Sequence, residues 1–577
     1  MTYPTIQALP TAPQRNQDPE DFTTTADTFV AALPTMVSEI NTSTAYIDNK
    51  AISVGNDFQG AYSAGTTYTL GQSVLYSEVY YISLVNDNTG NTPDSSPSDW
   101  SEIVTGGGGG SAGSVDFVAS GAISNGDVVV LNSDGTVSVG VATSAGTPTV
   151  FESGIVSFTA AVYDPNSNKV VIAYMDDSNS DYGTAIVGTV SGTSISFGTP
   201  VVYNSASSPS TVITFDSNSN KVVIAYRDFG NSQYGTAIVG TVSGTSISFG
   251  TPAVFESAIL DYISATFDSN SNKVVISYRD NGNSEYGTAV VGTVSGTSIS
   301  FGTPVVFRSS TIAFISSTFD TNSNKVIISY RDGGNSNYGT AIVGTVSGTS
   351  ISFGTAVVFD SQLIVYSSPT FDASNNKVVI AYERNSGNKG TAIVGTVSGT
   401  SISFGTAVEF ANNLTNFVSA SYNSSQNSVA IFYSDDDNAE RGTILAGTVS
   451  GTSISFGPPT VVELGRTRYG TVAFDTSAEK LVLAYKDVDN GEFGTAATFT
   501  FGNDGNGAIG LATQDMSDGA GASITTIGGV NESQSGLSIG SAYYLSASTD
   551  GGLTTSAEEG PKVGRAIAAD KILVTEG

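Results

Sequence analysis

The stretch that decides the fold is FDSNSNKVVISYRDNGNSEYGTAVVGTVSGTSISFGTPVVF, residues 267–307. Close copies of it recur along the chain, and one position inside it marks each copy. That position holds lysine in six copies and serine in one: Lys169, Lys221, Lys273, Lys325, Lys377, Ser428 and Lys480. The intervals are 52 residues, with a single interval of 51, so the chain carries seven copies. A fixed period of this size is typical of a repeat architecture.

Each copy contains four short apolar runs separated by polar turns. In the third copy these runs are Ile263–Phe267, Lys273–Tyr278, Thr288–Val294 and Thr297–Phe307, the last kinked at Gly302. Alternating Val, Ile, Tyr, Phe and Thr with Gly, Asn, Asp and Ser at the breaks predict β-strands. Four antiparallel strands in seven copies favour the blades of a β-propeller. A straight β-solenoid is the alternative, and ring closure decides between the two.

The ends of the repeat region predict that the ring closes. The seventh copy stops after its third run, 494–501, and lacks GTVSGTSISFG. The missing piece stands before the first copy as SAGTPTVF, residues 144–151, which matches SFGTPVVF. We therefore expect 144–151 to complete the last blade, because an open sheet edge invites aggregation. The sequence predicts a mainly β chain with a seven-bladed β-propeller over 143–502.

Composition excludes several classes of function. The chain has 577 residues, 21 basic against 52 acidic side chains, and a net charge of −31. Nucleic-acid binding needs basic stripes, so that partner is not expected. The absence of Cys and His removes disulfides, Cys or His metal sites and nucleophile–histidine pairs. No run approaches the ~20 apolar residues of a membrane span.

Residues 1–57 predict a short α-helical segment. Asp18-Pro19-Glu20-Asp21 is typical of a helix start. After Pro34 an apolar stripe with spacings of three and four runs from Val37 to Val54. It predicts either an oligomerising helix or a helix packed on its own chain.

Residues 58–104 predict a small β module rich in aromatic residues. The pattern Tyr68-x-x-Gly71-x-x-Val74-x-Tyr76, followed by Tyr80-Tyr81 and Trp100, resembles small chitin-binding-type carbohydrate modules. It departs from that family at Ser77-Glu78, where a glycine usually follows the tyrosine. Flat aromatic faces suit the apolar faces of sugar rings, but so small a module also needs aromatics for its core. The candidates for sugar stacking are Tyr62, Tyr76, Tyr81 and Trp100.

A glycine-rich linker over 105–114 precedes a terminal β domain in two pieces, 115–142 and 503–577, with the propeller inserted between them. FVASGAISNGDVVVLNSDGTVSVG, IGLATQDMSDGAGASITTIGGVNESQSGLSIGSAYYLS and KVGRAIAADKILV resemble the terminal domain of tail fibres of marine bacteriophages. APQRNQDPEDFTTTADTFVAALPTMVSEIN resembles the N-terminal segment that attaches such fibres to the virion. The resemblance implies a virion tail protein, commonly trimeric, that touches tail or baseplate proteins and the host surface.

The loops of a blade predict which face binds a receptor. The one-to-two and three-to-four turns, DSNSNK and SGTSIS, lie on one face and hardly change between copies. The two-to-three loops and the blade-to-blade segments lie on the other face and differ in every copy. A face that reads a ligand needs different groups in each blade, although drift on an unconstrained face is the alternative. Aromatic and arginine side chains are common binding anchors, and the candidates on this variable face are Phe158, Phe229, Tyr262, Phe314, Tyr366, Phe417, Arg466, Arg468 and Tyr469.

Two chemical details complete these expectations. Arg466 and Arg468 predict contact with an acidic group of the receptor, unless they only balance acids of their own blade such as Asp489. The run Asp435, Asp436 and Asp437 could hold Ca²⁺ through oxygen ligands, but a solvated turn explains it equally. No other cofactor is expected.

The function expected from the sequence is a fibre protein that binds a host glycan or protein. The alternatives are a virion decoration protein and a polysaccharide-depolymerising enzyme. Carboxylate catalysis needs two acids about 5–10 Å apart across a bond, and no motif in the chain predicts that arrangement.

Overall fold

The structure is a computed structural model. It describes residues 58–69, 72–77, 79–83, 87–96, 99–102, 114–131, 136–140, 142–412, 414–502, 508–526, 530–538, 541–546, 552–555, 562–568 and 571–574. The predicted helices in 1–57 and most of the predicted linker lie outside these residues. The chain divides into a ring unit, 144–501, and a flanking unit, 1–143 with 502–577.

The repeated unit of the ring is seen in the third copy. β21 (Lys273–Asp280) pairs antiparallel with β22 (Tyr286–Ser295), which pairs with the short β23 (Ser298–Phe301). The long β20 (Ala253–Asp268) serves two blades. Its first half pairs with β18 (Tyr234–Ser243) of the preceding copy, and its second half pairs with β21. One strand is therefore the outer edge of one blade and the inner strand of the next.

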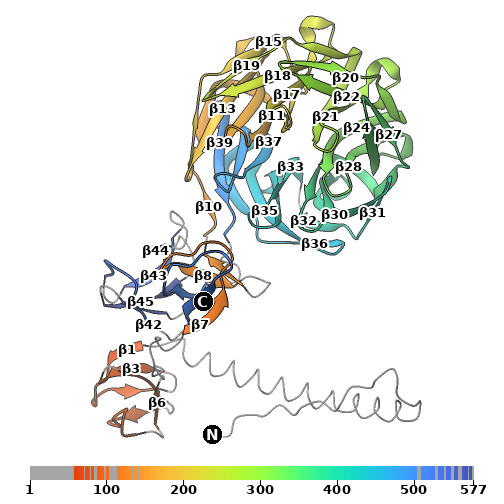
Figure 1. Ribbon diagram of the computed structural model, residues 1–577. Coiled ribbons are helices and arrows are strands. Elements are labelled where there is room, and N and C mark those ends of the chain that lie inside the picture. The colour runs from red at the N-terminus through yellow and green to blue at the C-terminus, as the bar shows by residue number, and fades with distance from the viewer. Residues whose placement is uncertain are drawn as a thin grey trace, which may run out of the picture. The chain divides into compact units, whose positions relative to one another are not determined.

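Strands of the same four kinds recur around the ring (Figure 1). The long strands are β11 (Thr149–Asp164), β15 with β16 (Val201–Ser207, Val212–Asp216), β20, β24 (Val305–Asp320), β28 (Val357–Asp372), β32 with β33 (Val408–Ala411, Thr415–Asn423) and β37 (Thr460–Asp475). The second strands are β12 (Lys169–Asp176), β17 (Lys221–Asp228), β21, β25 (Lys325–Asp332), β29 (Lys377–Arg384), β34 (Ser428–Asp435) and β38 (Lys480–Asp487). The third strands are β13 (Tyr182–Ser191), β18, β22, β26 (Tyr338–Ser347), β30 (Lys389–Ser398), β35 (Arg441–Ser450) and β39 (Phe493–Thr500). The short strands are β14 (Ser194–Phe197), β19 (Ser246–Phe249), β23, β27 (Ser350–Phe353), β31 (Ser401–Phe404) and β36 (Ser453–Phe456).

The predicted kink at Gly302 splits the fourth run into two strands. β23 and the first half of β24 both pair with β22, on either side of the glycine. The Gly302 backbone N–H donates to the carbonyl of Val291 at 2.9 Å. A Cβ at this position would lie 1.8 Å from the carbonyl oxygen of Thr349 in the next copy. Only glycine allows the backbones of neighbouring copies to approach this closely.

The ring closes as the sequence predicts. β10 (Ser144–Ala145) pairs with the end of β39, with Ser144 opposite Thr500. β11 continues along the same strand, with Thr149 opposite Ala496. The N-terminal piece of the ring thus supplies the missing outer strand of the last copy. The β-propeller expectation is confirmed by this pairing.

The core of the ring lies between neighbouring blades. Second strands such as β21 are buried at six successive or nearly successive positions because both of their faces are covered. One cluster joins Val223 of the second copy to Val274 and Ile276 of the third, and equivalent clusters join the other copies. A near-continuous apolar run is expected for a strand that is covered on both faces.

The flanking unit contains strands from both ends of the chain. β7 (Ser114–Val118), β8 (Val128–Leu131) and β9 (Val137–Val139) form one sheet with β40 (Ala508–Ala512) and β41 (Gly521–Thr526). A second sheet contains β42 (Val530–Asn531), β43 (Ala542–Leu545), β44 (Leu553–Thr554), β45 (Lys562–Ala568) and β46 (Lys571–Val574). The aromatic module contains β1 (Phe58–Ala61), β2 (Thr67–Tyr68), β3 (Ser73–Tyr76), β4 (Val79–Ser83), β5 (Asn88–Thr89) and β6 (Trp100–Glu102).

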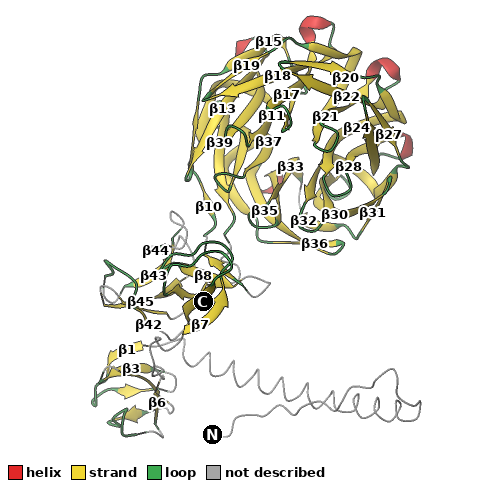
Figure 2. Cartoon of the chain, in the orientation of Figure 1, coloured by secondary structure: helices red, strands yellow, loops and turns green. Residues whose placement is uncertain are grey.

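Helix is scarce in the described part of the chain. Five three-residue 3-10 helices follow second strands of the ring, at 177–179, 229–231, 281–283, 333–335 and 436–438 (Figure 2). Over the described residues no helix has the length and apolar character needed to cross a membrane.

Replacing Phe151 by alanine tests the closing strand. Phe151 is 6% exposed and packs against Tyr174 and Phe197, with ring centroids 5.3 and 5.7 Å away. We expect the free energy of unfolding to fall by about 3–5 kcal/mol because a cavity opens at the closure. Val150→Ala, on the same strand but 40% exposed, is the matched control and should cost under about 1 kcal/mol. If Phe151→Ala and Val150→Ala lose the same free energy of unfolding in urea, packing at the closing strand is not what stabilises the ring.

Candidate functional site

In six of the seven copies the long strand contains a bulge at the same place. In β20 the register shifts between Asp261 and Ser264, so that two residues stand opposite one residue of β21. In the second copy the equivalent residue, Ser210, lies between β15 and β16. The residue at this position has a positive φ, between 50° and 58°, in all seven copies: Phe158, Ser210, Tyr262, Phe314, Tyr366, Phe417 and Tyr469. A positive φ is uncommon outside glycine and is a strained state for aromatic residues. The repeated strain marks this position as one that the whole ring holds in place.

The six aromatic residues at this position form an aromatic collar, a name we keep for Phe158, Tyr262, Phe314, Tyr366, Phe417 and Tyr469. The centroids of successive rings lie 5.2, 5.3, 5.2, 5.1 and 5.2 Å apart from Tyr262 through to Phe158. Ser210 holds the seventh position, so the collar is open there. All six rings are half-buried. Six of the nine residues predicted on the variable face therefore lie in one continuous arc.

Hydrogen bonds between copies fix the bulges. The N–H of Ser317 donates to the hydroxyl oxygen of Ser264 in the preceding copy at 2.9 Å. The N–H groups of Ala420 and Val472 donate in the same way to Ser368 and Ser419, at 3.0 and 3.2 Å. These bonds satisfy N–H groups next to the bulge, and an unsatisfied buried N–H would be costly. The collar thus rests on backbone that is tied from one copy to the next.

The penultimate residue of each second strand lies opposite the bulge region, and its residue type varies between copies. This position, the charge position, holds Met175, Arg227, Arg279, Arg331, Glu383, Ser434 and Lys486. The guanidinium carbon of Arg279 lies 4.8 Å from the ring centroid of Tyr262. That of Arg331 lies 4.7 Å from the centroid of Phe314, and Lys486 Nζ lies 5.9 Å from that of Tyr469. These distances allow cation–π attraction.

Sequence reasoning missed these residues because they end an otherwise regular strand. The signal was present in the second strands, where the residue after the buried tyrosine changes in the series YMD, YRD, YRD, YRD, YER, YSD, YKD. A position that varies inside a fixed strand is informative only once the structure puts it beside the collar.

Glu383 is the acid at the charge position. It is 2% exposed, and burial followed by the neighbouring charge of Asp436 raises its pKa to about 7. Tyr366 of the collar also feels its charge. A charged carboxylate here is therefore disfavoured, and near neutral pH a large fraction of Glu383 is protonated.

The remaining predicted binding residues lie outside the collar. Phe229 begins a 3-10 helix, is 44% exposed and lies 4.8 Å from the guanidinium carbon of Arg227. Arg466 pairs with Asp489 at 2.8 Å in its own copy, and Arg468 pairs with Glu440 at 3.3 Å. Both guanidinium groups already have carboxylate partners, so they are not free cations as the sequence suggested. Hydrogen bonding by Asp489 raises the pKa of Arg466.

The candidates for sugar stacking in the aromatic module are corrected in part. Trp100 is 2% exposed and Tyr81 is 8% exposed, and both belong to the core of the module with Tyr68 and Val74. The indole N–H of Trp100 donates to the carbonyl of Asn91 at 2.8 Å. The half-buried Tyr62 and Tyr76 pack against this core, with ring centroids 5.5 Å apart. Because the module is small, Trp100 and Tyr81 form its core, and their rings are not exposed for sugar stacking.

The acidic run of the sixth copy does not form a cluster. Asp435 ends β34, while Asp436 and Asp437 begin the following 3-10 helix, where Asp437 is exposed. Over the described residues, no group of three or more acidic side chains is placed to hold one metal ion.

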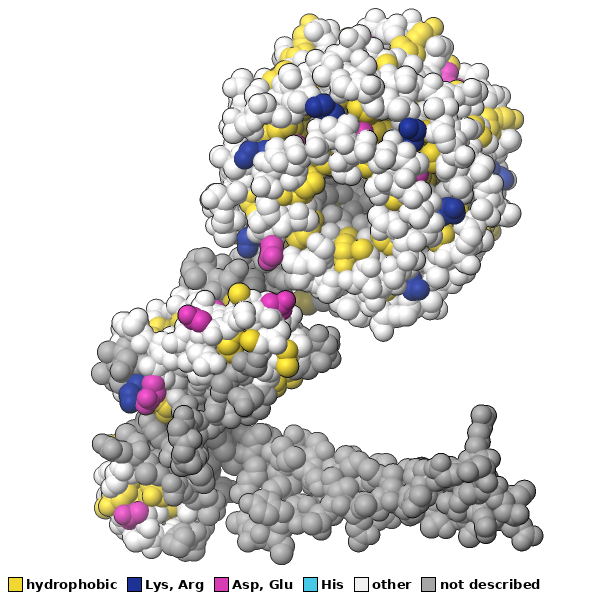
Figure 3. Space-filling view, in the orientation of Figure 1, with side chains coloured by type: hydrophobic (Ala, Val, Ile, Leu, Met, Phe, Trp, Pro, Cys, Tyr) yellow, Lys and Arg dark blue, Asp and Glu magenta, His cyan; other side chains and the backbone are white. Residues whose placement is uncertain are grey.

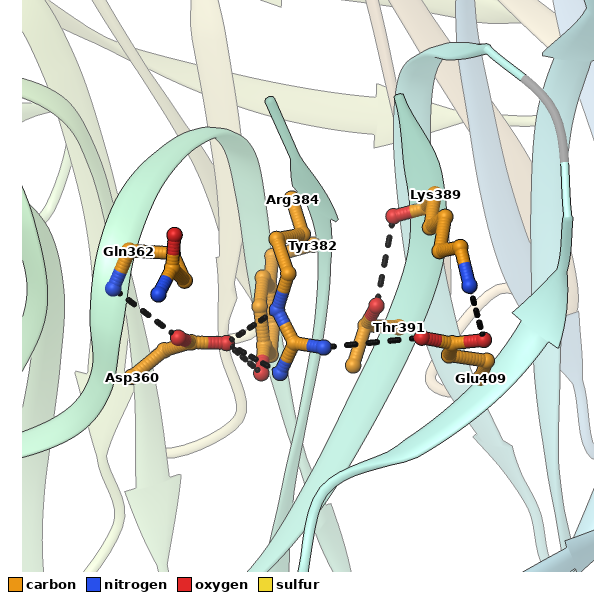
Figure 4. A network of polar contacts seen from close by, with 7 residues as sticks. All are labelled: Asp360, Gln362, Tyr382, Arg384, Lys389, Thr391 and Glu409. Atoms are coloured by element: carbon orange, nitrogen blue, oxygen red, sulfur yellow. Dashed lines mark hydrogen bonds and ion pairs between the residues drawn. The ribbon is translucent and has the colours of Figure 1, made fainter. Parts of the chain in front are cut away.

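A polar network in the fifth copy is a second concave feature (Figure 4). Asp360 accepts hydrogen bonds from Tyr382 at 2.7 Å and from Arg384 at 2.6 and 2.9 Å, while Lys389 pairs with Glu409 at 2.7 Å. These charges line a pocket of about 410 Å³. Arg384 replaces the aspartate that ends the other second strands, and here a turn replaces the 3-10 helix. Since these charges pair with one another, the network explains the local change of loop.

Comparison with known proteins finds only distant structural likeness. No family model matches the chain, and no curated protein matches it. Among solved structures, a lectin from Burkholderia pseudomallei is 9% identical, and the match covers 59% of this chain and 94% of that chain with a TM-score of 0.44. A leech intramolecular trans-sialidase is 10% identical, and the match covers 61% of this chain and 69% of that chain with a TM-score of 0.37. The Aleuria aurantia lectin is 12% identical, and the match covers 53% of this chain and 96% of that chain with a TM-score of 0.33. Likeness of this degree carries no argument about binding.

Glu383 predicts how stability changes with pH. The folded pKa of about 7 lies above the ordinary 4.5, so between these values the folded chain holds a proton that the unfolded chain has lost. The stabilisation is complete below pH ~4.5 and disappears as pH rises through ~7. Between pH 5 and pH 8 the free energy of unfolding of the parent should therefore fall. We expect this fall to be roughly 1–2 kcal/mol larger in the parent than in Glu383→Gln, because glutamine has no proton to lose. Thermal unfolding at both pH values measures this, with the exposed Asp437→Asn as control. A parallel pH dependence of variant and parent would contradict it.

Proposed function

We propose that the chain is a carbohydrate-binding protein and that the sugar contacts the aromatic collar on the variable face. The observation that carries the proposal is the arc of six half-buried aromatic rings held by strained, hydrogen-bonded backbone. Aromatic faces offer apolar area with little conformational entropy to lose, and preorganised backbone reduces the cost of binding. The charge position around the collar supplies polar groups that orient a ligand. Figure 3 shows one face of the ring, with a central hollow and separate Lys and Arg side chains spaced around it.

The setting we propose is a bacteriophage virion. The resemblance of the chain ends to tail-fibre proteins supports a trimeric fibre, fixed to tail or baseplate proteins through its N-terminus. In this proposal the seven repeats are seven blades of one propeller that carries the receptor site. The protein is a binder and not an enzyme, so incubation with a bound polysaccharide should release no new reducing or unsaturated ends.

The collar is tested by removing two of its rings. Phe314→Ala with Tyr366→Ala should weaken binding on a printed glycan array by about fivefold to 150-fold, because each ring contributes about 0.5–1.5 kcal/mol. The matched control is Ser295→Ala with Ser298→Ala, which alters the constant turn between β22 and β23 and should leave binding unchanged. Far-UV circular dichroism and thermal unfolding confirm that both variants remain folded.

If the constant-turn variant alone loses binding, the site lies on the other face. If both variants bind like the parent, the collar is not the contact surface.

A further inference from the structure

The arginines of the ring unit differ in whether they have a partner. The unit contains eight of them. Arg308, Arg384, Arg466 and Arg468 each pair with a carboxylate, and Arg227 and Arg279 share Asp261 at 2.5 and 2.9 Å. Arg441 donates to the carbonyl of Leu464 and to Asn438. The guanidinium of Arg331 makes no ion pair and no hydrogen bond with any residue that the structure describes.

Arg331 is held as a cation beside the collar. Its guanidinium carbon lies 4.7 Å from the centroid of Phe314, and the residue is half-buried. Burial lowers its pKa, and the nearby Arg279 lowers it further. Arginine nevertheless stays charged at any ordinary pH. None of the nitrogen atoms of Arg331 is among the buried side-chain atoms that lack a hydrogen-bond partner. Its N–H donors are therefore open to solvent and to the oxygen atoms of a ligand.

We propose that Arg331 binds the carboxylate or sulfate of an acidic sugar whose ring lies against Phe314 and Tyr366 of the collar. The inference rests on the proposed function and adds the class of sugar. The planar guanidinium fork matches the two oxygens of a carboxylate or sulfate. Phe314 holds one face of the fork, so the donors point along its edge. The same chemistry that the sequence assigned to Arg466 and Arg468 thus belongs to a residue in the fourth copy.

The surrounding charges favour this position. Arg227, Arg279 and Arg331 follow one another at the charge position, and Asp261 offsets one of their three charges. Each of these arginines is followed by an aspartate, Asp228, Asp280 and Asp332. Arg331 is the one of the three that has no ion pair among the described residues. Glu383 stands at the next charge position, and its raised pKa of about 7 reduces the repulsion it can exert on an anion. Lys486 and Arg468 pair with Glu492 and Glu440 and are neutralised locally.

The test compares acidic and neutral sugars on one printed array that contains matched pairs: oligogalacturonates with their methyl esters, and sulfated with unsulfated galactans. We expect the parent to prefer the acidic member of at least one type of pair, and the type shows whether carboxylate or sulfate is read. Arg331→Gln should weaken binding to that member by about tenfold to a hundredfold and leave binding to its neutral partner within about twofold. Arg331→Lys, which keeps the charge without the fork, should give an intermediate loss.

Lys325→Gln is the matched control because it removes one positive charge from the other end of the same strand, β25. It should bind acidic sugars like the parent. Equal binding of acidic and neutral members by the parent, or unchanged acidic binding by Arg331→Gln, would overturn the role of Arg331 while leaving glycan binding by the collar intact. If the parent binds no sugar on the array, the proposed function itself fails and this inference fails with it.

Discussion

The ring depends on one strand serving two blades. Each long strand begins as the outer edge of one blade and ends as the inner strand of the next, and the bulge lies where its role changes. A bulge increases local twist and redirects a side chain. Because it recurs at one register in the six copies that carry the aromatic residue, the redirected side chains meet one another as the collar. The serine-to-backbone bonds between copies then secure N–H groups beside the bulges. The closure strand, the collar and the variable face are all consequences of this shared strand.

Two positions at the junctions between blades show how charge varies on a constant frame. The fourth copy pairs Arg308 with Asp332, and the fifth pairs Asp360 with Arg384, so the same two positions exchange signs. In the third copy both positions are acidic, Glu256 and Asp280, and burial raises the pKa of each. The strands that carry the two positions are the same in all three cases, although the loop after Arg384 is a turn instead of a 3-10 helix. The frame therefore tolerates opposite ion pairs and paired acids, which allows the neighbouring face to vary without a change of fold.

The period of 52 residues and the missing last strand were enough to predict the repeat unit and the pairing of 144–151 with 494–501, because both follow from counting and from the need to cover an edge. The aromatic candidates were also found, since Tyr262 and its equivalents stood out in variable segments. Their arrangement as a touching arc could not be predicted, because it depends on a positive φ that aromatic sequences do not signal. Arg331 was missed because one varying residue inside a constant strand has no meaning before its neighbours are known. The sequence left Trp100 as either a sugar-stacking residue or part of the core of the module, and its burial makes it part of the core.

The two faces of the ring carry cations of different kinds. On the constant face the second strands begin with lysine in six copies, at 169, 221, 273, 325, 377 and 480. Because the same lysine recurs in nearly every copy, these charges are arranged almost symmetrically around the ring. Such an arrangement cannot orient an asymmetric ligand. On the collar face the equivalent strand ends carry three arginines in succession, then glutamate, serine, lysine and methionine. That order, together with the gap at Ser210, gives the collar a distinct charged side and a distinct opening. A ligand with one anionic group and one apolar face can therefore settle on it in one orientation, which a symmetric ring could not enforce.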